Sequence, residues 1–91
     1  MALSKKQILA LKAQAHSLKP VVLLGGKGLT PAVINEINLA LDHHELIKIR
    51  VPGEDRDERR AVITKICLET QAELIQVMGQ VATLYRKLEE E

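Results

Sequence analysis

The chain has 91 residues, of which 46% are hydrophobic and 27% are charged, and its formal net charge is +1. This size and composition predict one compact domain over residues 1–91 and argue against two. There is no Trp, no Phe and a single Tyr, Tyr85. This scarcity of rings argues against a protein that binds nucleic-acid bases by stacking them on aromatic side chains.

Cysteine content and hydropathy indicate the cellular compartment of the protein. A single cysteine, Cys67, excludes an internal disulfide and any zinc site built from several cysteines, and it fits a reducing environment. No apolar stretch approaches the ~18 residues of a membrane span. Residues 1–6 lead into an amphipathic segment, unlike the apolar core of a signal peptide. We therefore expect a cytoplasmic protein without a membrane partner.

Charge is unevenly distributed along the chain. Residues 1–35 carry five basic residues and no acidic one, whereas residues 36–91 carry eight basic and twelve acidic residues, so +5 and −4 give the net +1. The five are Lys5, Lys6, Lys12, Lys19 and Lys27. Such a local positive field attracts a polyanion, although chance segregation of solvated lysines gives the same count. The acidic end, residues 87–91, is expected to be a frayed tail.

The first half of the chain predicts a helix, a strand and a second helix. A Ser-x-x-Gln capping box at Ser4 favours a helix from about residue 5 to residue 15 or 16. The unbroken apolar run at residues 21–24 is typical of a short buried strand. A Thr-Pro pair at Thr30 then provides an N-cap and a first helical residue, which predicts a helix to about residue 42 or 43.

The second half predicts a strand, a third helix and a hairpin. Apolar and polar residues alternate over residues 47–51, as in a half-buried strand. Acidic residues after Pro52-Gly53 can cap a helix that runs to about residue 69. Two β-type runs, residues 74–78 and 81–85, are separated by Gly-Gln, a spacing that suits a tight hairpin.

The predicted order of elements is therefore α-β-α-β-α-β-β. Strands that alternate with helices imply parallel crossover connections, whereas the closing hairpin makes the last strand antiparallel. We expect an α/β fold in which helices pack on one mixed four-stranded sheet.

The loop Gly25-Gly26-Lys27-Gly28, between the first strand and the second helix, is the strongest candidate for a binding site. Glycines permit backbone conformations closed to other residues and let a bulky anion approach the main chain. The adjoining helix start adds N–H groups and a positive dipole end, and Lys27 adds a charge. The alternative is a turn whose glycines only make the bend. The spacing fits neither a Walker A loop nor a dinucleotide fingerprint.

Other basic residues admit two interpretations. Lys48 and Arg50 occupy the polar side of the second predicted strand, where they are either solvated or part of a binding surface. Arg56, Arg59 and Arg60 lie among the acids at the start of the third helix, so they either pair with those acids or meet phosphate.

No catalytic or metal-binding constellation emerges from the sequence, and we expect neither enzymatic activity nor a cofactor. Cys67 shares the core side of a helix with isoleucines, as a small buried hydrophobe does. His43 and His44 are adjacent on a helix and so do not face each other; they suit its negative C-terminal end. The acids around residues 54–58 complement a helix dipole and form no carboxylate pair of the kind used in acid-base catalysis.

Three segments of the chain together resemble a known family. They are Leu18-Lys-Pro-Val-Val-Leu-Leu-Gly-Gly-Lys-Gly-Leu-Thr30, His44-Glu-Leu-Ile-Lys-Ile-Arg-Val51, and Gly79 followed by Leu84-Tyr-Arg86. The chain is similar to the CRM domain (chloroplast RNA splicing and ribosome maturation) in its single-domain bacterial, YhbY-like form. The resemblance covers nearly the whole chain. It implies a fold like that of the C-terminal domain of translation initiation factor three, with an added N-terminal helix.

The resemblance also implies binding to structured RNA, and for the bacterial members an association with precursors of the large ribosomal subunit. The family's GxxG loop falls on Gly25, Gly26, Lys27 and Gly28. A basic surface beside it would use Lys5, Lys12 and Lys19, with Lys48 or Arg50 on the neighbouring strand. Contacts to phosphate and to RNA shape would dominate, because aromatic platforms are absent.

Two other classes of function remain open. The chain could be a protein-interaction module that docks on a ribosomal protein or assembly factor through its first helix, with Leu9 ringed by Lys5 and Lys12. It could also be a small enzyme that binds a phosphate-containing substrate at the glycine loop, although no acid, base or nucleophile accompanies that loop.

Overall fold

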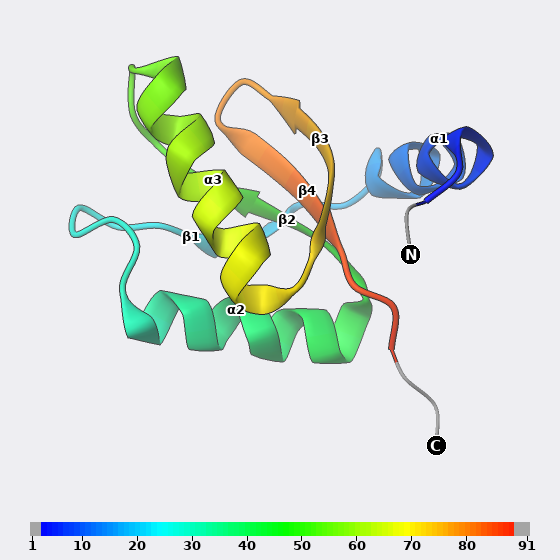
Figure 1. Ribbon diagram of the computed structural model, residues 1–91, viewed down its shortest axis with the longest axis horizontal. Helices are drawn as coiled ribbons and strands as arrows, with labels where there is room; N and C mark the ends of the chain where they lie inside the picture. The colour runs from blue at the N-terminus through cyan, green and yellow to red at the C-terminus, as the bar shows by residue number, and fades with distance from the viewer. Residues whose placement is uncertain (1–2, 89–91) are drawn as a thin grey trace.

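The computed structural model describes residues 3–88 and forms three helices and four strands within them (Figure 1). In chain order these are α1 (Lys5–Ala15), β1 (Pro20–Leu23), α2 (Pro31–His44), β2 (Leu46–Arg50), α3 (Arg56–Thr70), β3 (Glu73–Met78) and β4 (Val81–Tyr85). The predicted order is confirmed. The observed ends differ from the predicted ones by only one or two residues.

The four strands form one mixed sheet in the order β1-β2-β4-β3. Strands β1 and β2 are parallel, and β4 is antiparallel to both of its neighbours, β2 and β3. The chain therefore places its last strand between the second and the third. The predicted mixed four-stranded sheet with an antiparallel last strand is confirmed, and β1 and β3 are its edges.

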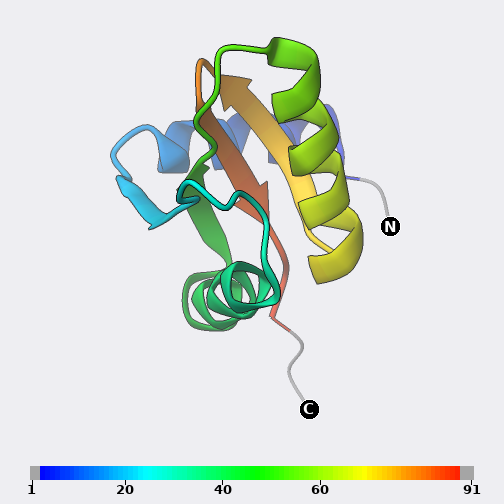
Figure 2. The same cartoon turned by 90° about the vertical axis from the view of Figure 1, so that its left-hand side faces the viewer.

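Helices cover both faces of the sheet (Figures 1 and 2). The larger core lies under α2 and α3 and contains Val22, Leu24, Ile37, Leu41, Ile47, Ile49, Val51, Ile63, Ile66, Ala82 and Leu84. A smaller core lies under α1 and contains Leu11, Ala15, Leu46 and Ile75. Because successive strand residues point to opposite faces, Ile47 and Ile49 belong to the first core and Leu46 to the second.

Side chains at the helix starts form the caps that the sequence predicts. Ser4 Oγ accepts the Gln7 N–H at 3.1 Å, and Gln7 Oε1 accepts the Ser4 N–H at 2.8 Å, which completes the capping box of α1. Thr30 caps α2, and Asp55, one of the acidic residues after Pro52-Gly53, caps α3. These bonds satisfy amides that a helix start otherwise leaves without partners.

The strand expected at residues 21–24 is present as β1, but it is buried on one face only. Val22 and Leu24 are buried, whereas Val21 is 54% and Leu23 63% exposed. The reason is tertiary: β1 is an edge strand whose α1-side face extends beyond the part of the sheet that α1 covers. An apolar run alone does not distinguish this arrangement from burial on both faces.

The end of the chain is held as far as Leu88. The Arg86 N–H donates to the Glu45 carbonyl at 2.9 Å, and the Leu88 N–H donates to Glu45 Oε1 at 2.9 Å. Residues 89–91 of the predicted tail lie outside the described residues. Across residues 3–88, no helix combines the length and apolarity needed to cross a membrane.

Candidate functional site

The glycine loop follows β1 and projects from the sheet before α2 begins (Figure 1). Its turn is closed by the Gly28 N–H, which donates to the Gly25 carbonyl at 2.9 Å. Gly28 has φ +69°, a conformation that side chains with a Cβ adopt at a cost, whereas Gly25 and Gly26 have negative φ. Open space surrounds the Cα atoms of Gly25 and Gly26. Within the loop, only Gly28 thus has a backbone conformation that favours glycine, although the sequence offered three glycines for the bend.

We expect Gly28→Ala to lower the free energy of unfolding by about 1 kcal/mol, because a Cβ in the left-handed region is strained. The matched substitution Gly26→Ala leaves stability unchanged or slightly raised, since it stiffens the unfolded chain without strain. Urea unfolding followed by circular dichroism measures both variants. Equal losses of stability would show that the turn does not depend on the conformation of Gly28.

The start of α2 has fewer free amides than the sequence implied. Pro31 has no N–H, and the Val33 N–H donates to Thr30 Oγ1 at 3.2 Å. The Ile34 N–H already donates to the Thr30 carbonyl within the helix. An anion at this loop would therefore depend on the loop backbone and on charged side chains more than on the helix amides.

Parallel pairing brings basic residues from remote segments to neighbouring strands. In the β1–β2 register Pro20 pairs with Lys48 and Leu23 pairs with Arg50, so Lys48 is adjacent to the strand that Lys19 precedes. The Leu24 N–H donates to the Arg50 carbonyl at 3.0 Å, which places Arg50 next to the start of the glycine loop. Lys19, Lys27 and Arg50 are exposed. We call Lys19, Lys27, Lys48 and Arg50 the β1–β2 basic surface.

Lys48 has a structural role as well. Its Nζ donates to the Leu18 carbonyl at 3.1 Å, and the side chain is half-buried. Lys48 and Arg50 lie on the α1 side of the sheet, because they alternate along β2 with Ile47 and Ile49, which are buried under α2 and α3. The Lys48 contact fixes the segment between α1 and β1, and thereby the position of Lys19.

Helix α1 does not lie beside the glycine loop. Figure 1 places the start of α1, at Lys5, and the loop at opposite ends of the long axis of the molecule. Helix α1 packs on β2 and β3, on the opposite face of the sheet from α2 and α3, and Lys12 is half-buried on it. The fold therefore does not bring Lys5 to the glycine loop. Lys12 lies in the last turn of α1, before the segment that leads to β1.

Lys65 is a neighbour of the loop that the sequence did not reveal. It lies on α3 and lines a hollow together with Leu29, Thr30 and Pro31 at the end of the glycine loop. Lys65 is exposed and, within the described part of the chain, forms no ion pair. Nothing in the local sequence could assign it to this place, because the packing of α3 beside α2 brings it there.

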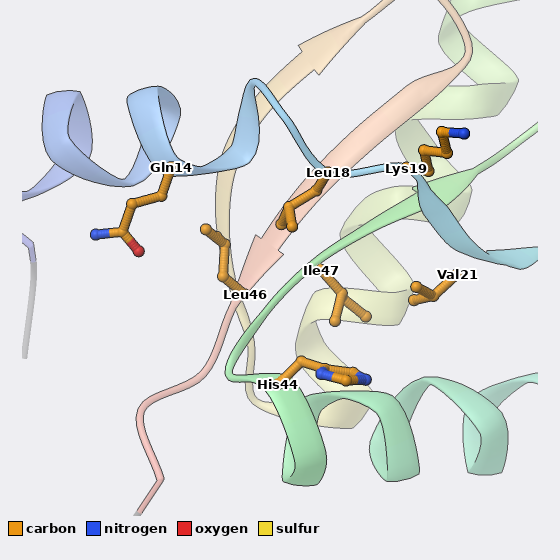
Figure 3. A pocket seen from close by; sticks show the side chains of 7 residues that line it. All are labelled: Gln14, Leu18, Lys19, Val21, His44, Leu46 and Ile47. Carbon is orange, nitrogen blue, oxygen red and sulfur yellow. The ribbon is translucent and has the colours of Figure 1, made fainter.

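A cavity of about 450 Å³ adjoins Lys19 on the β1 edge of the sheet (Figure 3). Figure 3 shows Leu18, Val21, Leu46 and Ile47 converging on it, with the His44 ring below them. Gln14 and Lys19 complete its lining. The β1–β2 basic surface thus borders a mainly aliphatic hollow.

The residues considered for catalysis remain scattered. Cys67 is half-buried; burial raises the pKa of its thiol, and the nearby Glu73 carboxylate raises it further. A thiol in that state is a poor nucleophile at neutral pH. His43 and His44 end α2, as expected. Residues 3–88 hold no group of three or more His, Cys, Asp or Glu side chains placed to bind a metal ion.

Fold and surface together define a small α/β domain with a glycine loop and a basic surface along two parallel strands. The chain belongs to the CRS1/YhbY (CRM) domain family, whose model matches residues 3–86. It is 51% identical over 88 residues to a Haemophilus influenzae protein named RNA-binding protein, covering 97% of this chain and 89% of that one. A Pseudomonas aeruginosa protein named as a probable RNA-binding protein is 40% identical over 87 residues, covering 96% of this chain and 84% of that one.

A solved structure agrees with the fold. The solution structure of a hypothetical protein from Staphylococcus aureus matches with a TM-score of 0.84 at 30% sequence identity. The match covers 98% of this chain and 93% of that one. The order of elements expected from the family resemblance is thus found in a relative as well.

Proposed function

We propose that this protein binds structured RNA, without catalysing a reaction, through the glycine loop and the β1–β2 basic surface. The observation that carries the proposal is the gathering of Lys19, Lys27 and Arg50, from segments far apart in sequence, along two parallel strands and the loop after them. All three are exposed. Family membership and the names of the relatives support the same class of ligand.

The chemistry of this surface favours recognition of the RNA backbone. Lysine and arginine side chains bind phosphate, and an uncrowded glycine loop lets a backbone approach closely. Residues 3–88 offer only one Phe, Tyr or Trp ring, Tyr85, and it packs against the core under α1. Readout of unpaired bases by aromatic stacking is therefore disfavoured, whereas shape and phosphate positions of a folded RNA suit the surface.

The RNA that we propose is large-subunit ribosomal RNA, bound during assembly of that subunit. The resemblance to the bacterial form of the family supports this choice. The β1–β2 basic surface forms the centre of the site. Lys5 and Lys12 contribute where a larger RNA extends from Lys48 and Arg50, on the α1 side of the sheet, onto α1 itself.

Binding of the wild-type protein to ribosomal RNA fragments, measured across a salt series, tests the proposal. We expect tighter binding to large-subunit fragments than to small-subunit fragments of equal length. We also expect the logarithm of the affinity to fall linearly with the logarithm of the salt concentration, because phosphate contacts release counterions. Equal affinity for both RNAs would contradict only the assignment to the large subunit. Absence of salt-sensitive binding to any RNA would contradict the function.

A second function, docking on a protein partner through α1, is favoured by a separate observation. Leu9 is 65% exposed on α1, Lys5 near it is exposed, and this helix starts far from the glycine loop. If α1 docks on a ribosomal protein or assembly factor, Leu9→Asp abolishes co-purification with assembling particles and leaves affinity for naked RNA unchanged. Leu68→Asp, at a 75% exposed leucine on α3, is the matched control. Wild-type behaviour of Leu9→Asp would remove this alternative.

A further inference from the structure

A cavity of about 310 Å³ lies between the start of α3 and the β3–β4 hairpin, apart from the β1–β2 basic surface. Its lining is Arg56, Arg59, Arg60, Ile63, Val77 and Gly79, and we call it the arginine pocket. The three arginines are spaced i, i+3 and i+4, which places them on one face of the helix. Ile63, one turn later, is buried at 2% exposure and anchors that face to the core.

The arginines of this pocket form no ion pair with the neighbouring acids among the described residues. Glu54, Asp55, Asp57 and Glu58 surround them in sequence. Yet the only ion pair within residues 3–88 joins Arg86 and Asp42. Asp55 is engaged elsewhere, because its Oδ1 accepts the N–H groups of Asp57 at 2.8 Å and Glu58 at 3.2 Å. Of the two interpretations that the sequence left open, pairing with the acids is therefore wrong.

The position of the arginines works against helix stability. Positive side chains at a helix N-terminus oppose the positive end of the helix dipole. Arg56 is the first residue of α3, and Arg59 and Arg60 follow within about one turn. Asp55, Asp57 and Glu58 at the same helix start offset this cost. The side chains of Arg56 and Arg60 make no ion pair or hydrogen bond within residues 3–88, so their donors are available to a ligand.

The pocket is also held in place before any ligand binds. Arg59 Nη1 donates to the Gly53 carbonyl, and Gln80 Nε2 of the hairpin turn donates to the same oxygen at 3.4 Å. The Val51 N–H donates to the Gln80 carbonyl at 2.7 Å. These bonds connect the helix start, the loop after β2 and the hairpin turn, so the Arg59 side chain is positioned. The side chains of Arg56 and Arg60 make no hydrogen bond to another described residue.

We propose that the arginine pocket binds a phosphate group of the same RNA, as a second contact beyond the β1–β2 basic surface; this inference rests on the proposed function. Guanidinium groups present forked donors that match phosphate oxygens. The pocket and the glycine loop lie at the same end of the sheet, because β1 and β3 run in the same direction. Three strand spacings separate these strands, roughly 14 Å, a distance that a folded RNA can span between two phosphates.

The test measures RNA affinity across a salt series for two variants, Arg56→Gln/Arg60→Gln and Lys27→Gln. The control is Lys87→Gln, which removes an exposed charge from a residue that belongs to neither site. We expect the arginine variant to flatten the plot of log affinity against log salt by roughly 0.7 to 0.9, the contribution of one phosphate contact. Lys87→Gln should leave the slope unchanged. The melting temperature of the arginine variant should be unchanged or higher, because the removed charges opposed the helix dipole.

The outcomes separate the pocket from the proposed function. A wild-type slope in the arginine variant, together with a flatter slope in Lys27→Gln, would overturn the phosphate pocket and leave RNA binding at the loop intact. A lowered melting temperature would assign the arginines to the fold and also overturn the inference. A flatter slope in the arginine variant alone would support the pocket and contradict the loop. No RNA binding by the wild type would remove both.

Discussion

Replacing Arg86 with alanine is expected to lower the free energy of unfolding by about 3 kcal/mol, because it leaves several acceptors without their donor. The Arg86 guanidinium donates to Asn38 Oδ1 at 2.8 Å, to the Asn38 carbonyl at 3.1 Å, to the Thr70 carbonyl at 2.7 Å and to Asp42 Oδ1 at 2.6 Å. Its side chain is only 22% exposed. One residue after β4 thus ties α2 and the end of α3 to the sheet.

A matched pair of variants separates the hydrogen-bond network from the ion pair. Asp42 is 62% exposed, so its charge contributes little, and Asp42→Asn should cost less than about 1 kcal/mol. Arg86→Lys should recover only a minor part of the loss, since an ammonium group cannot donate along a planar fork. Urea unfolding followed by circular dichroism suits a chain without Trp. A similar loss for Asp42→Asn and Arg86→Ala would show that the ion pair, and not the network, carries the stabilisation.

The double variant Lys27→Gln/Arg50→Gln is expected to bind RNA roughly 40-fold more weakly at 0.1 M salt, if each side chain contacts one phosphate with a salt slope of about 0.8. Both side chains are exposed and make no hydrogen bond to another described residue, so the fold should survive. Lys48 is left intact because its Nζ holds the segment before β1. The readout is the affinity across a salt series, on the RNA that the wild type binds best.

The control for this variant removes two exposed charges elsewhere, as Lys6→Gln/Lys87→Gln. It should lower affinity only slightly, through the weaker overall field of the protein. A second comparison, Lys5→Gln/Lys12→Gln, asks whether the RNA extends onto helix α1. Equal losses in the double variant and its control would mean that net charge, and not the glycine loop with its neighbouring strand, determines binding.

Much of the local structure follows from short stretches of sequence. Caps at Ser4, Thr30 and Asp55 define where helices begin, because the capping bonds form within three residues. The alternation in β2 and the short link between β3 and β4 are likewise local patterns. The glycine loop was also recognisable from sequence, since Gly28 occupies a backbone conformation that glycine adopts without strain.

The tertiary structure alone decided how these pieces combine. The exposure of Val21 and Leu23 depends on β1 being an edge strand, and the adjacency of Arg50 to the glycine loop depends on the β1–β2 register. The same holds for Lys65 beside the loop and for Arg86 among the acceptors of α2 and α3. Sequence periodicity specifies which face of an element is apolar, but the partner of that face is set by long-range packing. The candidate loop was therefore visible in the sequence, whereas the surface around it and the arginine pocket exist only in the fold.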